Sequence, residues 1–342
     1  MKYLFLAAAA ASLVIPAYAQ VPEPAAIPSP GEIAAAAPAA DWIAIAPSDL
    51  LVMDLAPDAK GNPRRVVIQL MPAPFSQGWI GNIRKLAAAH WWDGTSVNRV
   101  QDNYVAQWGD ATEKKPLPDG LATVPESEYV AADPASGTVT MNGKTVVRLS
   151  GDEAARRVER AKRAKASDIF GRGLQPETDA YAPKTAFESG WPIGLDDSKV
   201  PDERWPLHCY GAVGVGRNLS PDTGTGAELY AVIGHAPRHL DRNIALVGRV
   251  IGGIEFLSSL PRGTGALGFY EDEAERVPIR SIRLASDLPT AEQPKFEYLS
   301  TESNSFARYA DARQNRRDPF FIKPAGGADI CNIPVPIRPV AK

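Results

Sequence analysis

The segment spanning residues 97–110, VNRVQDNYVAQWGD, constrains the fold more than any other part of this chain. The alternating pattern over residues 97–107 predicts a β-strand with two different faces. A β-bulge at Asp102 and Asn103 would shift that pattern by one residue. With the shift, a cation, an aromatic ring and a side-chain amide would converge on one small volume: Arg99, Tyr104 and Gln107.

A fixed cation beside an aromatic wall and an amide suits a neutral amide ligand better than a phosphate. The alternative interpretation is an ordinary antiparallel strand with a solvated arginine and a structural glutamine. Each residue taken singly fits that alternative, whereas the whole spacing favours a site.

The spacing Arg-x4-aromatic-x2-Gln-x-Gly-Asp resembles the signature of cyclophilin-type peptidyl-prolyl isomerases, which opens Phe-His-Arg and continues to Phe-x-x-Gln-Gly-Gly-Asp. Residues 92–95, WDGT, stand where that family has a Tyr-Asp-Gly-Thr turn. The resemblance implies a mainly β fold with helices, namely a cyclophilin-like closed antiparallel β-barrel capped by helices.

The segments before and after the signature fit the order of elements in such a barrel. Residues 50–55 and 65–70 predict an opening hairpin, and residues 75–89 predict a helix from their apolar spacing. Further along the chain, residues 251–260 are expected to form a helix and residues 277–284 the closing strand.

Residues 210–217, YGAVGVGR, align with the family's Gly-x-x-x-Met-Ala-Asn strand. Gly216 and Arg217 take its last two places, so the resemblance implies a backbone edge offered to an extended peptide. The glycines also spell a loose Gly-x-x-Gly-x-Gly. A dinucleotide site is rejected because a turn at residues 218–222, and not a helix, follows them.

Residues 224–232 resemble the family's Gly-Ser-Gln-Phe-Phe-Ile strand, with Glu228 in place of a glutamine. Tyr230 stands where a phenylalanine usually floors the proline pocket. A buried tyrosine hydroxyl needs a partner, and Glu228 is near enough in sequence to supply one.

Residues 240–250 resemble Leu-Asp-Gly-x4-Phe-Gly-x-Val. His239 falls where many members have tryptophan, and Ile244 falls where many have histidine. These departures affect the catalytic rate and the residue preferred before proline more than the fold.

The activity implied by the resemblance is cis-trans isomerisation of X-Pro peptide bonds. Rotation about a peptide C–N bond costs about 18–20 kcal/mol, so unaided exchange is slow. Arg99 would donate toward the prolyl nitrogen as catalytic residue, and Gln107 would hold the neighbouring backbone. Because arginine stays protonated, neither acid-base chemistry nor a cofactor is required. The implied substrate-binding residues are Tyr104, Val105, Gln107, Gly216, Arg217, Glu228, Tyr230, His239 and Leu240.

A second hypothesis comes from another functional class. The altered pocket and a long insertion also fit a periplasmic chaperone or scaffold that binds extended peptide but isomerises it poorly. Either function implies proline-containing polypeptides as partners.

The N-terminus predicts export. Residues 1–19 combine Lys2, an apolar core and an Ala-x-Ala site, which is typical of a signal peptide cleaved before Gln20. The apolar run is too short for a confident membrane span, and no other segment approaches its length, so no stable membrane insertion is expected after cleavage. The mature protein is expected in the periplasm or outside the cell.

The remaining chain divides into a leader, a domain with an insertion, and an extension. Residues 20–40 are Pro- and Ala-rich and predict a flexible or polyproline-like leader, with a short helix at residues 32–37 as the alternative. The cyclophilin-like domain is expected over residues 41–285, the insertion over about 111–207, and the C-terminal extension over 286–342.

Local patterns predict structure within the insertion and the extension. In the insertion they predict a hairpin at residues 138–149, a basic helix at 151–166 and a turn-rich loop at 187–194 bordering the site. In the extension, a short helix around Phe306 and Arg313 is expected to pack on the barrel.

The two cysteines, Cys209 and Cys331, could pair in an oxidising compartment, although the sequence does not give their separation. His235 and His239 have a helical metal-ligand spacing, but Pro237 lies between them and no carboxylate or thiolate supports them, so no metal is predicted. A net charge of −3 argues against general nucleic-acid binding.

Overall fold

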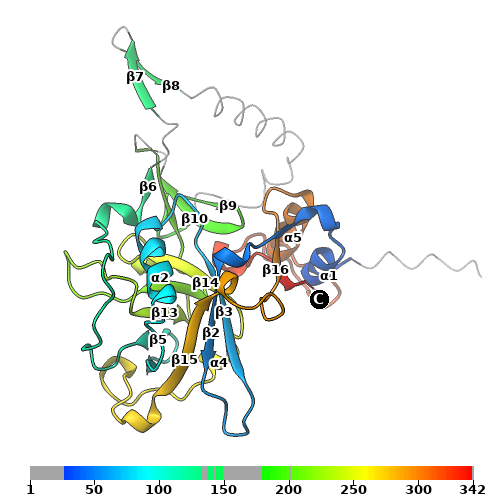
Figure 1. Ribbon diagram of the computed structural model, residues 1–342. Coiled ribbons are helices and arrows are strands. Elements are labelled where there is room, and N and C mark those ends of the chain that lie inside the picture. The colour runs from blue at the N-terminus through cyan, green and yellow to red at the C-terminus, as the bar shows by residue number, and fades with distance from the viewer. Residues whose placement is uncertain are drawn as a thin grey trace, which may run out of the picture.

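Eight antiparallel strands close into a β-barrel at the centre of the molecule (Figure 1). The computed structural model describes residues 27–132, 137–141, 144–148, 179–196, 198–199 and 202–340. The barrel order is β12-β13-β5-β4-β15-β2-β3-β14, and β14 pairs back with β12. This architecture confirms the predicted fold class. The barrel strands are β2 (Leu50–Leu55), β3 (Arg64–Leu70), β4 (Ser96–Val100), β5 (Val105–Gly109), β12 (Ala212–Val215), β13 (Leu229–Val232), β14 (Leu246–Gly252) and β15 (Val277–Leu284).

The opening hairpin of β2 and β3 is apolar on both faces because each face packs against a different core. Leu51, Met53 and Leu55 belong to the main core inside the barrel. The alternate residues Leu50 and Val52 belong to a second core, shared with the C-terminal extension. Since successive side chains of a strand point to opposite faces, this hairpin joins the two cores.

Helix α2 (Gln77–Ala88) packs its apolar side into the barrel core, as its spacing predicts. The second predicted helix is much shorter than expected: β14 runs to Gly252, and only α4 (Glu255–Ser258) is helical. Gly253 separates the two with a φ of 78°, a left-handed conformation that glycine adopts easily. The side chains that α2 buries are Trp79, Ile80, Asn82, Ile83, Leu86 and Ala87.

The strand predicted over residues 97–107 is a hairpin and not a single strand. β4 and β5 pair antiparallel, which sets Arg99 opposite Gln107. The register shift lies between Val97 and Arg99, not at Asp102 and Asn103. Asn103 instead turns the chain with a φ of 50°. The predicted convergence therefore occurs across two strands.

The described part of the insertion forms a four-stranded sheet in the order β6-β11-β10-β9. Residues 187–194 belong to the β9–β10 hairpin and are not the predicted loop bordering the site. Arg249 of β14 anchors this hairpin by donating to the Gly190 carbonyl and stacking on Trp191. The sheet strands are β6 (Ala131–Ala132), β9 (Lys184–Glu188), β10 (Trp191–Asp196) and β11 (Glu203–Pro206).

A separate hairpin projects from the insertion, at the top of Figure 1. β7 (Gly137–Met141) pairs with β8 (Lys144–Arg148), as the turn signal predicts. The helix predicted at residues 151–166 lies outside the described residues, as does the signal peptide.

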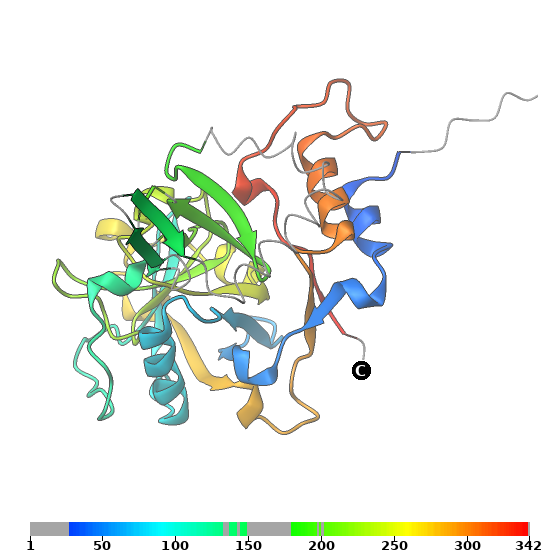
Figure 2. The same ribbon diagram turned by 90° about the horizontal axis from the view of Figure 1, so that it is seen from above.

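The C-terminal extension and the leader pack together on the barrel (Figures 1 and 2). α5 (Asn304–Gln314) lies beside α1 (Pro30–Ala35), and both contribute to the second core. The flexible leader predicted for this segment is thus wrong over α1, and the helical alternative is correct. A three-stranded sheet of β1 (Trp42–Ala44), β16 (Phe296–Leu299) and β17 (Ile337–Pro339) completes this region.

A disulfide joins Cys209, next to the barrel strand β12, to Cys331 in the extension. Their Cα atoms lie 5.2 Å apart across a sequence separation of 122 residues. The two cysteines thus pair, and the bond fixes the C-terminal segment to the barrel.

Candidate active site

A cavity of about 570 Å³ opens beside the β4–β5 hairpin. Its other walls include strand β13, the segments after β5 and β12, and the loop before β15. The fold thus gathers segments from both halves of the barrel around one space. Eight of the residues singled out from the sequence line it: Arg99, Tyr104, Val105, Gln107, Gly216, Arg217, Glu228 and Tyr230.

Four barrel strands set the central side chains in a row. Arg99 on β4 faces Gln107 on β5, and Gln107 faces Tyr230 on β13. Tyr230 in turn faces Gly214 on β12. Because strand register fixes these pairs, backbone pairing alone aligns the cation, the amide and the ring.

The guanidinium of Arg99 is held by three protein acceptors. Its Nε donates to the carbonyl of Leu267 at 2.7 Å, and Nη1 donates to Oε1 of Gln107 at 3.0 Å. Nη2 donates to Oε1 of Gln101. A guanidinium has five N–H donors, so two remain beyond these three contacts. The cation is therefore fixed in direction and still able to donate to a ligand.

Aromatic rings flank this cation. The guanidinium carbon lies 5.8 Å from the ring centroid of Tyr104 and 5.4 Å from that of Phe269. Burial lowers the pKa of Arg99, but a guanidinium still stays protonated at neutral pH. No carboxylate forms an ion pair with Arg99 within the part of the chain that the structure describes. The site thus presents a positive charge between two aromatic rings.

The floor of the cavity is the buried ring of Tyr230. Its hydroxyl pairs with Nε2 of His208 at 3.0 Å, and not with the predicted partner Glu228. Gly214 makes room for it, since a Cβ at that position would lie 2.3 Å from the tyrosine oxygen. The floor is therefore an aromatic ring, and its hydroxyl forms a hydrogen bond with His208 on the side away from the cavity.

Glu228 lies in the cavity wall beside Gln107. Its Oε1 accepts from the backbone N–H of Asp110 at 2.7 Å. Burial raises the pKa of Glu228 to about 7, the nearby charges of Asp110 and Glu113 add to this effect, and hydrogen bonds from Asp110 and Gln107 oppose it. This carboxyl group thus changes charge near neutral pH.

The sheet edge predicted at residues 210–217 is largely absent. β12 is flanked by both β13 and β14, and the N–H of Gly216 already donates to the Glu228 carbonyl at 2.8 Å. Arg217 donates to the carbonyls of Asn243 and Asn218. Of residues 210–217, only Gly216 and Arg217 line the cavity.

The sequence pattern of the family "Cyclophilin type peptidyl-prolyl cis-trans isomerase/CLD" matches residues 65–284, which span the barrel from β3 to β15. The chain belongs to this cyclophilin family. None of the curated proteins compared with it matches.

A solved cyclophilin structure shares the fold. A cyclophilin from Hirschia baltica is 22% identical with a TM-score of 0.59, over 87% of this chain and 93% of its own. A cyclophilin type peptidyl-prolyl cis-trans isomerase from Cryptosporidium parvum, crystallised in the presence of the dipeptide ala-pro, is 10% identical with a TM-score of 0.34. The match covers 68% of this chain and 98% of that one.

Two residues implied by the resemblance to cyclophilins lie outside the cavity: His239 and Leu240. Both belong to a 3₁₀ turn, Arg238–Leu240, whose first side chain is buried in ion pairs. That burial turns His239 outward, where it is exposed. Ile244 lines this side of the cavity.

Several residues of the cyclophilin site carry no signal that the sequence patterns above use, among them Leu267, Phe269 and His208. Leu267 and Phe269 come from the loop before β15, and His208 precedes β12. The sequence GALGFY, residues 265–270, carries an aromatic residue among glycines, which was the available signal for this loop. His208 belongs to no sequence motif that would indicate a role in the site.

The described ranges contain neither a cluster of potential metal ligands nor a membrane-spanning helix. Neither His235 nor His239 joins a group of three potential metal ligands there. Among the helices of those ranges, none is both long enough and apolar enough to cross a membrane.

Proposed function

We propose that this cyclophilin catalyses cis-trans isomerisation of X-Pro bonds in exported polypeptides. The observation that carries the proposal is the Arg99 guanidinium, which is fixed by three acceptors beside an aromatic-lined cavity. Arg99 acts as the catalytic residue, and the other lining residues bind substrate.

The mechanism follows from the electronic change in a twisting amide. Resonance is lost as the C–N bond rotates, and the nitrogen lone pair becomes localised. A donor from Arg99 to that nitrogen stabilises the twisted state more than the planar one, which is the condition for catalysis. The Tyr230 ring, with Tyr104 and Val105, supports the proline ring, and Gln107 orients both Arg99 and the substrate backbone.

The decisive experiment is Arg99→Ala, measured by exchange NMR on a proline-containing peptide. Isomerisation should fall by on the order of a hundredfold, because a charge-assisted donor to the twisted amide contributes about 1.5–3 kcal/mol. The free energy of unfolding should change by far less than this increase in the activation free energy. Unchanged activity with an intact fold would rule out the assigned role.

Arg262→Ala is the matched control. Arg262 pairs with Asp102 close to the same hairpin, but it does not line the cavity. Its removal should leave the exchange rate unaltered.

The second candidate is a peptide-binding chaperone or scaffold. The observation that favours it is the changed pocket, in which Tyr230 and Glu228 replace the family's phenylalanine and glutamine. Peptide binding by the wild-type protein without measurable exchange would support this alternative.

Export to the periplasm or beyond is supported by two features. Residues 1–19 have the pattern of a signal peptide, and disulfides such as Cys209–Cys331 persist in oxidising compartments. N-terminal sequencing of the protein purified from the cell envelope or the medium should begin at Gln20. A start at Met1 would contradict export by cleavage.

A further inference from the structure

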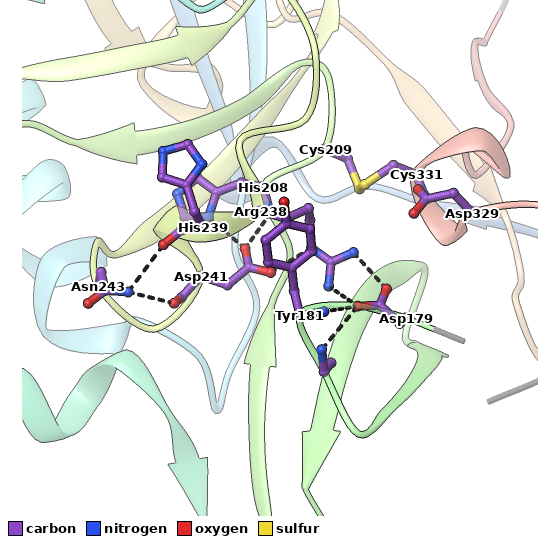
Figure 3. Close-up of polar contacts among 11 residues, drawn as sticks. Asp179, Tyr181, His208, Cys209, Arg238, His239, Asp241, Asn243, Asp329 and Cys331 are labelled. Atoms are coloured by element: carbon purple, nitrogen blue, oxygen red, sulfur yellow. Dashed lines mark hydrogen bonds and ion pairs between the residues drawn. A yellow bond between two sulfur atoms is a disulfide. The ribbon is translucent and has the colours of Figure 1, made fainter. Parts of the chain in front are cut away.

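A chain of buried polar side chains runs from the floor of the cavity to the insertion. Behind Tyr230, Nδ1 of His208 lies 2.9 Å from Oδ1 of Asp241. Oδ2 of Asp241 accepts from Nε of Arg238 at 2.6 Å, and Arg238 donates through both terminal nitrogens to Asp179 at 2.9 and 3.1 Å (Figure 3). We call these four residues the relay: His208, Asp241, Arg238 and Asp179.

We propose that the relay positions the Tyr230 ring for isomerisation and ties the proline pocket to the insertion. Its members are positioning residues, because Tyr230 alone faces the cavity. The inference rests on the proposed function and adds residues that do not line the cavity.

The burial of the relay indicates how firmly it is held. The exposed fraction of the side chain is 1% for His208, 2% for Asp241, 3% for Arg238 and 8% for Asp179. Buried polar groups that are fully paired rigidify their surroundings, whereas loss of one partner leaves a costly unpaired group. The relay therefore allows Tyr230 little freedom to move.

The hydrogen-bond directions are set by chemistry. The Asp241 carboxylate only accepts, so Nδ1 of His208 carries a proton and donates to it. With a neutral imidazole, Nε2 is then an acceptor, and the Tyr230 hydroxyl donates to it. Burial raises the pKa of Tyr230 well above its ordinary value, so the phenol keeps its proton.

The outer end of the relay belongs to the insertion. Oδ1 of Asp179 also accepts from the backbone N–H groups of Tyr181 and Ala182, and the Tyr181 ring lies 5.4 Å from the Arg238 guanidinium carbon. A phenylalanine floor would need no such network. The hydroxyl of Tyr230 is therefore the group through which the relay connects the insertion to the proline pocket.

The test is a double-mutant cycle between His208→Gln and Tyr230→Phe, with kcat/KM for a proline peptide as readout. His208→Gln should lower kcat/KM by about tenfold in the wild-type background, because residues in contact couple strongly. In the Tyr230→Phe background the same change should have less than about a twofold effect, since the connection to the ring is already cut. Equal losses in both backgrounds would overturn the proposal.

Asp179→Asn supplies a second cycle if His208→Gln does not fold. It weakens the outer ion pair and should lower kcat/KM by about threefold, again only while Tyr230 is present. Glu188→Gln is the control, because Glu188 pairs with Arg204 at 2.9 Å inside the same insertion but does not touch the relay. If Asp179→Asn and Glu188→Gln lowered kcat/KM equally, the relay would only stabilise the fold and would not position Tyr230.

The two proposals fail in different ways. If the wild-type protein isomerises the peptide and the cycles are additive, the relay is refuted and the isomerase stands. If the wild-type protein binds the peptide without turnover, the isomerase is refuted. The same cycles are then read from the dissociation constant of the peptide, and additive losses there refute the relay as well.

Discussion

Replacing Glu228 by glutamine should stabilise the fold at alkaline pH and not at acidic pH. Glutamine keeps the size of the side chain and the oxygen that accepts from the Asp110 N–H. It removes the ionisation and also turns the second oxygen, which can accept from Gln107, into an NH2 group. Any difference that depends on pH therefore reports the cost of a carboxylate in this wall.

The size of this difference in the free energy of unfolding follows from the raised pKa of Glu228. The folded protein holds the Glu228 proton up to about pH 7, whereas an unfolded chain releases it near 4.5. Between these values the unfolded state binds fewer protons, so the free energy of unfolding of the wild type falls as the pH rises. At about 1.4 kcal/mol per pH unit, the loss reaches at most about 3.5 kcal/mol above pH 7, and screening by solvent in the cavity makes it smaller.

Urea unfolding of both proteins at several pH values between 4 and 8.5 measures this. Their free energies of unfolding should agree near pH 4 and diverge as the pH rises, with Glu228→Gln the more stable. Glu273→Gln, at an exposed glutamate outside the cavity, should show no such divergence. A constant gap between wild type and Glu228→Gln at all pH values would refute the assigned burial cost.

Two further predictions concern the attachment of the C-terminal extension. Replacing both Cys209 and Cys331 by serine should lower the free energy of unfolding by up to about 5 kcal/mol, because the bond closes a long loop; a urea midpoint unchanged by this double substitution would contradict that. Phe306→Ala, at a fully buried side chain of the second core, should cost about 3–5 kcal/mol in chemical denaturation, and Phe321→Ala at the partly exposed neighbouring loop should cost much less. Equal effects of these two substitutions would show that the extension does not pack as one unit with β2 and β3.

Much of the barrel could be predicted because strand periodicity is local. Residues 50–55 and 277–284 form the expected strands. The alternating pattern predicts one strand through Arg99 and Gln107, because it does not distinguish a positive-φ turn at Asn103 from a bulge there. The helix α1 carried a readable signal, since Ser29 and Glu32 form a capping box.

The site was only partly predictable because some of its contacts depend on tertiary structure. Arg99, Gln107 and Tyr230 align through strand register, which a signature can encode. The hydrogen bond from Tyr230 to His208 joins two segments whose separation in space no periodicity reports. The sequence therefore predicts the wrong partner for the hydroxyl. His239 fits the family's spacing, yet the burial of its neighbour Arg238 points it away from the cavity.

The pairing of α1 with α5 has a consequence for biosynthesis. The first helix of the described chain leaves the ribosome hundreds of residues before the helix against which it packs. Until translation is nearly finished, Ala34 and the outer face of the β2–β3 hairpin lack the apolar cover that α5 and the C-terminal segment supply. We therefore expect a nascent chain to need shielding of that face up to the last stage of its synthesis.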